Sequence, residues 1–313
     1  MSMEKKCVYL SDSDGIHDLR WRSALEVMGW DVSLAVTDSH TPVIAGPITT
    51  TLVKSLANCS NPIIGLSWGW DLHASEIRQS VAWLRTLSGL IVDSVPTMEI
   101  AISLGANPDS IAMIPWGIDL NQFSPIPRSE KIDLSILSLR AHEPIYRVDT
   151  ILGAVSHLQE KGIACSLTVG NEGTLTDTLK HQVDDLGLHH VEFIGHIQER
   201  ELPALFGKHG FYVSAAETDG TSVTLLQAMA MEVPVVVSDS PGNVAWLKNN
   251  PEPTGRLFVI GDSFNLELTL LEAVNFPEVT KNMAQHGREV VERDADWNQN
   301  IWRLDHLLAS HLV

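Results

Sequence analysis

Short apolar runs alternate with helix-forming stretches along almost the whole chain, and this alternation limits the fold more than any other sequence feature. The runs lack the polar alternation of a strand with one face in water, so both faces of each predicted strand are buried. The predicted strands are residues 7–10, 32–36, 43–45, 63–66, 90–92, 134–139, 166–169, 191–194, 211–214 and 235–238. Buried strands separated by helices are typical of a parallel sheet with helices on both sides.

The stretches between the strands have the spacing of helices that bury one face. In the first of them, Trp21, Leu25 and Met28 lie on one side of the helix, and Gly29 ends it. Further helices are predicted at residues 75–87, 96–104, 148–161, 174–186, 199–206 and 222–231. The sequence therefore predicts an α/β fold built from doubly wound parallel sheets.

A proline-containing segment, residues 114–131, interrupts this alternation, which restarts beyond it. We place a domain boundary there and predict two Rossmann-like domains, residues 1–124 and 125–295, that face each other across a cleft. Residues 296–313 form a predicted helical tail with one apolar stripe. A chain of 313 residues is long enough for two such domains.

Composition and charge exclude several classes of protein. The formal net charge of −18 repels nucleic acid and anionic membrane surfaces. The chain has no run of 18 apolar residues, and its first residues lack the apolar core of a signal peptide, so we expect no integral membrane contact. The three cysteines form neither a disulfide pattern nor a metal-binding pattern and fit a reducing compartment. We therefore expect a cytoplasmic protein.

The clearest candidate site follows the predicted strand at residues 211–214. Asp219, Gly220, Thr221 and Ser222 come after this strand and directly before a predicted helix. In a parallel sheet, ligands bind beyond the carboxyl ends of the strands, and the free N–H groups in the first turn of a helix attract anions. Gly220 lets a ligand approach the backbone, and the Asp219 carboxylate can accept hydrogen bonds from sugar hydroxyls. The alternative is that these residues only cap a helix.

Several segments fit one known sequence pattern. The segment DGTSVTLLQAMAMEVPVVVSD, residues 219–239, separates Asp219 from Gln227 by seven positions. Other segments that fit the pattern are IPWGIDLNQFSP, SLRAHEPIYRVDTILGAV, LTVGNEG, VEFIGHIQERELPALF, HDLRW, AGP and SWGWDL. In this order and spacing they resemble the signature motifs of glycosyltransferase family 4, whose members are retaining enzymes with the GT-B fold.

The resemblance implies a hexosyltransferase-type enzyme that moves a sugar from a nucleotide diphosphate to an acceptor, without a metal or other cofactor. Residues 1–124 would then form the acceptor side, and residues 125–295 would bind the nucleotide sugar. The helix at residues 296–313 would pack back on the first domain. The implied partners are a nucleotide-sugar donor and an acceptor that is a saccharide, a lipid-linked compound or a small molecule.

The family pattern also implies a role for individual residues. Arg140 would neutralise the diphosphate, and Asp219 would contact the transferred sugar. Gln227 would hold the ribose hydroxyls, and Ile197 would lie near the base. The backbone amides that would face the sugar and the phosphates are those of Gly220, Thr221 and Ser222. The remaining implied donor-binding positions are Gly15, Gly170 and Gly195.

In the second domain, two positions depart from the family pattern in ways that affect charge. Tyr146 stands where the family has a Lys beside the Arg, or Ile145 does if a one-residue insertion is aligned differently. Half of the positive clamp on the leaving diphosphate is then missing, unless Arg147 replaces it. Gln227 replaces a Glu, which keeps a hydrogen-bond acceptor but loses the charge.

Two further departures concern the first domain and the end of a helix. Trp68 replaces a His of the first domain, and the nearest polar side chains, Asp71 and His73, are our candidates to orient the sugar during catalysis. Glu232 stands where the family has a Gly, a residue that suits the end of a helix better.

Two other functions fit parts of the sequence. Residues 8–15, VYLSDSDG, and residues 258–266, FVIGDSFNL, resemble the two ends of haloacid-dehalogenase-type phosphatases, but Leu266 stands where a Mg²⁺-binding Asp belongs. The second alternative is a catalytically weakened GT-B homologue that binds a nucleotide or a sugar, or supports a partner enzyme. It is suggested by Tyr146, Gln227 and Trp68, and sugar transfer or hydrolysis of the nucleotide sugar distinguishes it from an active enzyme.

Overall fold

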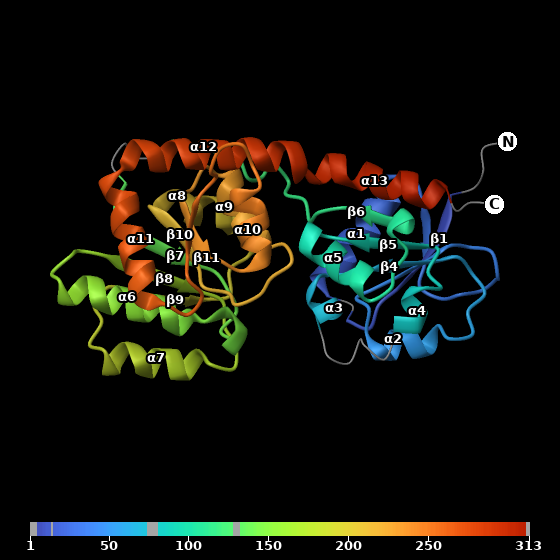
Figure 1. Ribbon diagram of the computed structural model, residues 1–313, viewed down its shortest axis with the longest axis horizontal. Helices are drawn as coiled ribbons and strands as arrows, with labels where there is room; N and C mark the ends of the chain where they lie inside the picture. Colours follow the sequence, from blue (N-terminus) through green and yellow to red (C-terminus); the bar gives the residue numbers. More distant parts are fainter. Residues whose placement is uncertain (1–4, 14, 74–80, 128–131, 311–313) are drawn as a thin grey trace. The chain divides into compact units, whose positions relative to one another are not determined.

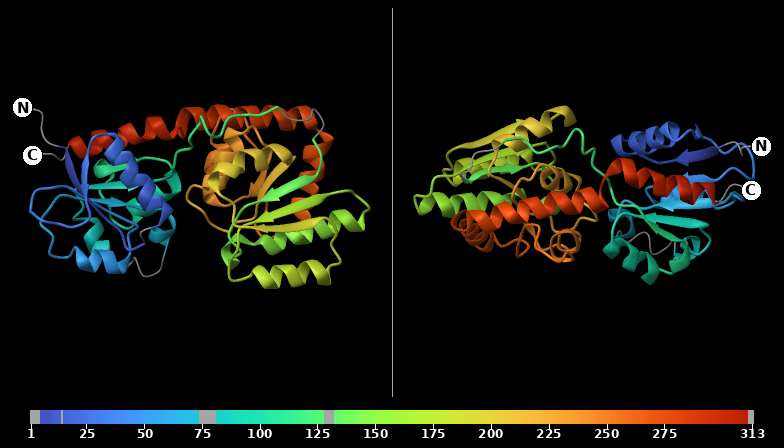
Figure 2. Two further views of the ribbon diagram at one scale, coloured as in Figure 1. Left: turned by 180° about the vertical axis from the view of Figure 1, so that it is seen from behind. Right: turned by 90° about the horizontal axis from the view of Figure 1, so that it is seen from above.

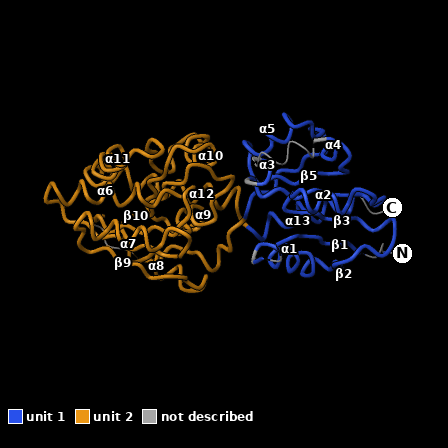
Figure 3. Tube along the Cα trace, turned by 90° about the horizontal axis from the view of Figure 1, so that it is seen from below, with its two compact units in different colours: residues 1–116, 297–313 blue, residues 117–296 orange. Residues whose placement is uncertain are grey.

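The computed structural model describes residues 5–13, 15–73, 81–127 and 132–310. The chain divides into two compact units (Figure 3). Unit 1 contains Met1–Trp116 and Trp297–Val313, and unit 2 contains Gly117–Asp296.

Unit 1 is built on a parallel sheet whose central strands are buried. The strands are β1 (Lys6–Leu10), β2 (Asp31–Ser33), β3 (Val43–Ala45), β4 (Ile63–Leu66), β5 (Gly89–Val92) and β6 (Ile111–Met113). Within the described residues the sheet has six strands in the order β2-β1-β3-β4-β5-β6, all paired in parallel. The order reverses between β1 and β3, so the loops after these two strands separate at the carboxyl edge of the sheet.

The helices of unit 1 include the last helix of the chain. They are α1 (Ile16–Val27), α2 (Thr50–Ser55), α3 (Trp70–His73), α4 (Val81–Leu84), α5 (Val95–Ser103), the short η2 (Pro108–Ser110) and α13 (Trp297–Ala309). As expected, α1 buries Trp21 and Leu25, and Gly29 follows it with a φ of +83°. The helix α13 contacts α1 within unit 1 (Figure 1). The buried apolar stripe of α13 consists of Ile301, Leu304 and Leu308.

Unit 2 repeats the same plan with longer helices. Its strands are β7 (Ser135–Ser138), β8 (Ser166–Gly170), β9 (Val191–Gly195), β10 (Phe211–Ser214), β11 (Val235–Ser238) and β12 (Arg256–Phe258). Its helices are η3 (Pro144–Tyr146), α6 (Val148–Glu160), α7 (Thr176–Asp185), η4 (Glu199–Glu201), α8 (Leu202–Lys208), α9 (Val223–Ala230), α10 (Pro241–Lys248), α11 (Ser263–Asn275) and α12 (Pro277–Asp294). In the described residues the parallel order is β12-β11-β10-β7-β8-β9.

Helices cover both faces of the sheet of unit 2 (Figures 1 and 2). Tyr212 of β10 belongs to a buried apolar cluster with residues of α8, α9, α10 and α12. Its neighbours Phe211 and Val213 belong to a second buried cluster with residues of α6, α7 and α11. Alternate residues of one strand thus reach opposite helical layers, as expected for a strand that is buried on both faces. The prediction of an α/β fold with doubly wound parallel sheets is confirmed.

The structure differs from the predicted elements at the sheet edges and in the helices α2, α10, α11 and α12, which were not among the predicted ones. The strand predicted at residues 32–36 is limited to β2, and β6 and β12, which are only partly buried, were not predicted. The helix predicted at 199–206 divides into η4 and α8. Of the helix predicted at 75–87, residues 75–80 lie outside the described residues, and α4 lies in the remainder.

The end of α9 has a strained backbone. Glu232 has a φ of +52°, in the left-handed region that favours glycine. Its N–H donates to the carbonyl of Met229, and the N–H of Val233 donates to the carbonyl of Ala228. These two bonds form a Schellman motif, which usually has Gly at this position. The expected misfit of Glu232 is therefore present in the structure.

Candidate functional site

The sheet of unit 2 reverses its strand order between β7 and β10, which pair side by side although they are far apart in the chain. Arg140 lies in the loop after β7, and the segment from Asp219 to Ser222 lies in the loop after β10. Ligands of open α/β sheets bind at such a reversal point, beyond the carboxyl ends of the strands. The fold thus brings together Arg140 and Ser222, which are 82 positions apart in the sequence.

Arg140 makes the main contacts at this point. Its Nη2 lies 2.8 Å from Oδ2 of Asp219, and its Nη1 donates a hydrogen bond of 2.9 Å to Oγ of Ser222. The ring of Tyr146 covers the guanidinium, with its centre 4.2 Å from Cζ. Burial alone lowers the pKa of Arg140, but the nearby Asp219 carboxylate raises it, and the net direction is upward. Arg140 is therefore a charged group in a mostly enclosed position, with 12% of its side chain exposed.

The loop after β10 is shaped by a close backbone approach. Ser222 is the N-cap of α9 and accepts a hydrogen bond from the N–H of Leu225 at 3.4 Å. A Cβ atom on Gly242, at the start of α10, would overlap the carbonyl oxygens of Asp219 and Gly220. Only a glycine allows α10 to begin so close to this loop. Gly220, Thr221 and Ser222 are buried, while Asp219 is partly exposed.

Gln227 of α9 has an unsatisfied polar group. Its side chain is 3% exposed, and Oε1 has no hydrogen-bond partner among the described residues. A buried acceptor without a partner costs about 1–3 kcal/mol, so a ligand that supplies a hydroxyl group would recover this energy. The sequence predicts ribose hydroxyls for this role.

Three further predicted positions come together at the ends of β8 and β9. Gly170 ends β8, Gly195 ends β9 with a φ of +66°, and Ile197 follows two residues later. A Cβ atom on Gly170 would overlap the side chains of Ile197 and Leu139. The N–H of Asn171 donates to the carbonyl of Gly195 at 2.6 Å. The loops after β7, β8 and β9 therefore meet next to the residue that precedes Arg140.

The turn η3 and the residue after it contain the position at which the family has a lysine. Tyr146 covers Arg140, and Arg147 has the left-handed backbone angles φ 45° and ψ 45°. Nη1 of Arg147 lies 2.8 Å from Oε1 of Glu217, and Nη2 lies 3.1 Å from Oδ2 of Asp149. Hydrogen bonds to these two carboxylates raise the pKa of Arg147. Arg147, the cation that could replace the missing lysine, thus already pairs with two carboxylates.

Gly15 lies in unit 1, at the start of α1. Its N–H donates to Oδ2 of Asp18 at 2.8 Å, and Tyr9 donates its hydroxyl to Oδ1 of the same carboxylate at 2.9 Å. Burial, followed by the charge of Asp18, raises the pKa of Tyr9. These bonds fix the loop that carries Gly15, and the contact of Gly15 with a nucleotide sugar stays a prediction.

Asp71 is held inside unit 1. The carboxylate is 1% exposed and accepts hydrogen bonds from the N–H of Ile48, Trp68 and Leu72 and from the hydroxyl of Ser67. Burial raises its pKa to about 6, although these hydrogen bonds act in the opposite direction. The carboxylate joins the loop after β3 to the loop after β4.

His73 and Trp68 are the other residues singled out in this part of the chain. His73 ends α3, and its side chain lies outside the described part of the structure. The Trp68 ring makes an edge contact with His17, with 5.2 Å between the ring centres.

An aromatic cluster in unit 1 goes beyond the sequence prediction, which singled out Trp68 as a departure from the family pattern. His17 lies 4.6 Å from Trp116, which stacks on Trp21 at 5.7 Å between ring centres. Trp297 of α13 contacts both tryptophans, and Arg20 lies 4.1 Å from the centre of the Trp297 ring. Burial is the main cause that lowers the pKa of His17. The sequence feature that could have revealed this cluster is Trp297, which lies at the start of the C-terminal helix, before its apolar stripe.

The two segments that resemble a phosphatase belong to different units of the chain. Asp12 belongs to unit 1, and Asp14 lies outside the described residues. Asp262 belongs to unit 2, where it caps α11 by accepting a hydrogen bond of 2.8 Å from the N–H of Asn265.

Two searches of the described residues bear on cofactors and membranes. Nowhere in the described ranges do three His, Cys, Asp or Glu side chains gather in a way that could hold a metal ion. In the same ranges, every helix is either too short or too polar to cross a bilayer.

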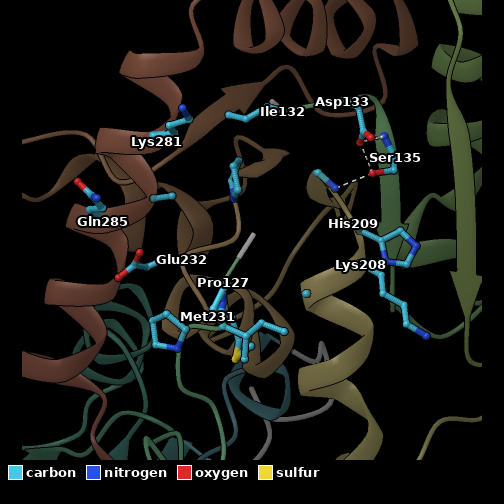
Figure 4. Close-up of a pocket in the computed structure, with 16 residues that line it drawn as sticks. Pro127, Ile132, Asp133, Ser135, Lys208, His209, Met231, Glu232, Lys281 and Gln285 are labelled. Atoms are coloured by element: carbon cyan, nitrogen blue, oxygen red, sulfur yellow. Dashed lines mark hydrogen bonds between the residues drawn. The ribbon is translucent and has the colours of Figure 1, made fainter. Parts of the chain in front are cut away.

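A cavity of about 580 Å³ lies at the other edge of the sheet in unit 2 (Figure 4). Its lining comes from the residues just before β7, β10 and β11 and from α12. Figure 4 shows on one side Lys281, Gln285 and Glu232, and on the other side Ser135, His209 and Lys208. Because Arg140 follows the carboxyl end of β7, this cavity is separate from the predicted site.

Sequence comparison assigns the chain to a known family. Residues 121–290, more than half of the chain, match the family glycosyl transferases group 1. A glycosyltransferase 1 domain-containing protein of Xenopus tropicalis is 31% identical over 108 residues, which are 34% of this chain and 30% of that protein. A GDP-mannose-dependent phosphatidylinositol monomannoside mannosyltransferase of Mycobacterium tuberculosis is 25% identical over 220 residues, 64% of this chain and 54% of that enzyme. The chain thus spans about a third to a half of these two relatives.

The fold also matches solved structures. The Anabaena protein HepE, in complex with UDP and glucose, superposes with a TM-score of 0.79 at 15% sequence identity. The match covers 98% of this chain and 100% of that one. This similarity supports the GT-B fold of the two sheets.

Proposed function

Because the chain belongs to the glycosyl transferases group 1 family, we propose that it is a retaining glycosyltransferase of family 4 type that takes its sugar from a nucleoside diphosphate. The observation that carries the proposal is the contact of Arg140 with Asp219 and Ser222 at the reversal point of unit 2. A guanidinium there has the charge and the paired N–H groups that a diphosphate requires. The first turn of α9 adds the positive end of a helix dipole.

We assign roles to the residues of unit 2 on this basis. Arg140 stabilises the charge that develops on the leaving diphosphate, and Asp219 accepts hydrogen bonds from the sugar. Gln227 accepts a hydrogen bond from the ribose, which satisfies its buried oxygen. Ile197 contacts the base. The glycine and amide positions assigned to the nucleotide sugar are Gly15, Gly170, Gly195, Gly220, Thr221 and Ser222.

Catalysis in this proposal depends on positioning and electrostatics, with the diphosphate balanced by Arg140 and the helix terminus instead of a metal. Unit 1 contributes the acceptor side, where His73 is the remaining candidate to orient the sugar. Asp71 holds this part of unit 1 together, because all its hydrogen bonds named above come from its own unit. A cytoplasmic location remains a prediction.

UDP-glucose is the first nucleotide sugar to test, since HepE binds UDP and glucose on a similar fold. GDP-mannose is the second, since the mycobacterial relative depends on it. The acceptor is a saccharide, a lipid-linked compound or a small molecule.

Thermal unfolding with UDP, GDP, ADP or dTDP tests the nucleotide site. A ligand at about one hundred times its Kd adds about 2.7 kcal/mol to the free energy of unfolding, which raises Tm by a few degrees. Hydrolysis of the matching nucleotide sugar then tests the chemistry, and the anomeric configuration of a transferred product tests retention. No shift with any nucleotide would contradict the proposal.

One observation favours the catalytically weakened homologue as the second candidate. Arg147, the cation next in sequence to the missing lysine, is paired with Glu217 and Asp149 and is not free for a phosphate. A protein that binds a nucleotide but neither hydrolyses nor transfers the sugar would fit this candidate.

A further inference from the structure

We propose that Tyr146 is a positioning residue whose ring holds the guanidinium of Arg140 in the orientation that receives the diphosphate. This inference rests on the proposed function. It concerns the residue at which the chain departs from the family pattern, and it explains how one arginine can act without the second cation.

The contacts of Arg140 use different parts of the guanidinium. Asp219 and Ser222 contact the nitrogen edge at 2.8 and 2.9 Å, whereas Tyr146 covers the flat face at 4.2 Å. Stacking on the face does not use an N–H group, and a side-chain hydrogen bond between Arg140 and Tyr146 also contributes to the raised pKa of the arginine. The ring and this bond restrict the side chain, and the N–H groups that these contacts leave unused can donate to phosphate oxygens. An arginine that is already oriented loses less conformational entropy when the ligand binds.

The position of Tyr146 is itself fixed from two sides. The carbonyl of Ile145 accepts a hydrogen bond of 2.8 Å from the N–H of Glu217, in the loop that also carries Asp219. Arg147 follows directly and lies 2.8 Å from the Glu217 side chain, with a second ion pair to Asp149. The turn that presents the ring is therefore attached to the loop that presents the carboxylate. The three groups around Arg140 form one connected arrangement.

Tyr146 has no evident part in the apolar core. Its side chain is only partly buried, and the buried apolar clusters described for unit 2 do not include it. A structural role would affect the free energy of unfolding, while a positioning role affects turnover. The two can be separated by experiment.

The experiment compares Tyr146→Phe with Tyr146→Leu in the full chain. The readouts are UDP affinity by calorimetry, kcat and KM for hydrolysis of UDP-glucose, and the free energy of unfolding without a ligand. If the parent binds GDP or ADP instead of UDP, that nucleotide and its sugar are the probes. We expect Tyr146→Phe to stay within about twofold of the parent and Tyr146→Leu to lose about tenfold in kcat, with a smaller change in KM.

A matched control is Phe264→Leu. The Phe264 ring lies 5.3 Å from Nζ of Lys161 and makes an edge contact with His157 of α6, and none of the contacts described for Arg140 involves it. This control also removes a ring next to a cation, and we expect it to leave kcat unchanged.

Two results would overturn the inference while the proposed function survives. The first is a Tyr146→Leu variant with the kcat of the parent. The second is a Tyr146→Phe variant that loses as much as Tyr146→Leu, because the hydroxyl group and not the ring would then be the active part. A parent that binds none of UDP, GDP, ADP and dTDP contradicts the proposed function and this inference together. A third result would also overturn the inference. If Tyr146→Leu lowers the free energy of unfolding, and its loss of kcat is accounted for by the fraction of protein that is unfolded, the ring has a structural role.

Discussion

The carboxyl edges of the two sheets can be compared directly, because both belong to parallel sheets whose strand order reverses. In unit 2 this edge retains polar groups that the described residues do not fully satisfy, such as the buried Oε1 of Gln227. In unit 1 the buried carboxylate of Asp71 accepts four hydrogen bonds from its own unit. Unit 1 also contains the stacked rings of Trp21 and Trp116, and the buried Nε1 of Trp21 has no hydrogen-bond partner among the described residues.

The difference teaches which polar residues at such an edge are available for a ligand. A carboxylate whose oxygens are already used by its own loops stabilises those loops, as Asp71 does. A side chain with an unused buried oxygen, or a cation at a partly open position, has bonding capacity left for a ligand. Position at the sheet edge alone does not separate these two cases.

The largest expected effect comes from removal of the cation of unit 2. Arg140→Ala should lower the rate of sugar transfer or hydrolysis by about 100- to 1,000-fold, because one electrostatic contact to a developing charge is lost. It should also weaken UDP binding. Steady-state kinetics measure this, with Arg293→Ala as the control, since Arg293 forms an exposed ion pair with Asp294. Unchanged turnover in Arg140→Ala would mean that the cation at the carboxyl edge of unit 2 does not act on the ligand, and the contrast with Asp71 in unit 1 would be lost.

The second largest effect should come from the buried Oε1 of Gln227, which has no hydrogen-bond partner among the described residues. If Gln227 accepts a hydrogen bond from the ribose, the parent should bind UDP more tightly than 2′-deoxy-UDP. Gln227→Leu should then reduce this preference by about tenfold, which corresponds to about 1.4 kcal/mol. Calorimetry with both nucleotides measures the ratio, and Gln285→Leu, an exposed position on α12, serves as the control. If Gln227→Leu keeps the full preference for UDP over 2′-deoxy-UDP, the ribose does not bind at Gln227.

The buried carboxylate of Asp71 in unit 1 should affect the free energy of unfolding and the way it changes with pH. Burial raises the pKa of Asp71 to about 6, so the folded form favours the protonated carboxyl and gains stability as the pH falls. Between pH 7 and pH 5 the parent should gain about 1 kcal/mol in free energy of unfolding relative to Asp71→Asn. Chemical unfolding followed by tryptophan fluorescence measures the difference. A pH-independent difference would mean that Asp71 is charged throughout this range.

The smallest effect concerns the amino edge of unit 2, away from both carboxyl edges. Glu232→Gly should raise the free energy of unfolding by about 0.5–1 kcal/mol, because glycine adopts the left-handed backbone of the Schellman motif without strain. Glu232→Ala keeps a Cβ atom and should gain less. Thermal unfolding measures both variants, and UDP affinity should not change in either. A loss of stability in Glu232→Gly would contradict the assigned strain.

Much of the architecture could be predicted because buried parallel strands leave a clear pattern. The runs at β3, β4, β10 and β11 were recognisable from their apolar residues, and the position of Asp219 after β10 followed from them. The edge strands β6 and β12 were not predicted: they are only partly buried, unlike β3, which has the same length, and β12 begins with the charged Arg256.

The site was predictable as a set of residues but not as a set of contacts. A motif places Arg140 and Asp219 at neighbouring strand ends, yet only the structure reveals that they pair with each other and that a tyrosine covers the arginine. Arg147 was a candidate for the diphosphate until its two carboxylate partners became visible. Such contacts join distant segments, and no local pattern records them.

The return of α13 to unit 1 has a consequence for synthesis. Unit 1 consists of Met1–Trp116 and Trp297–Val313, so all of unit 2 is synthesised before the last helix of unit 1. Until that helix is made, the surface of α1 that α13 covers has no partner from it, while unit 2 already has its complete sequence. Unit 1 therefore begins the chain but is the last of the two units to be completed.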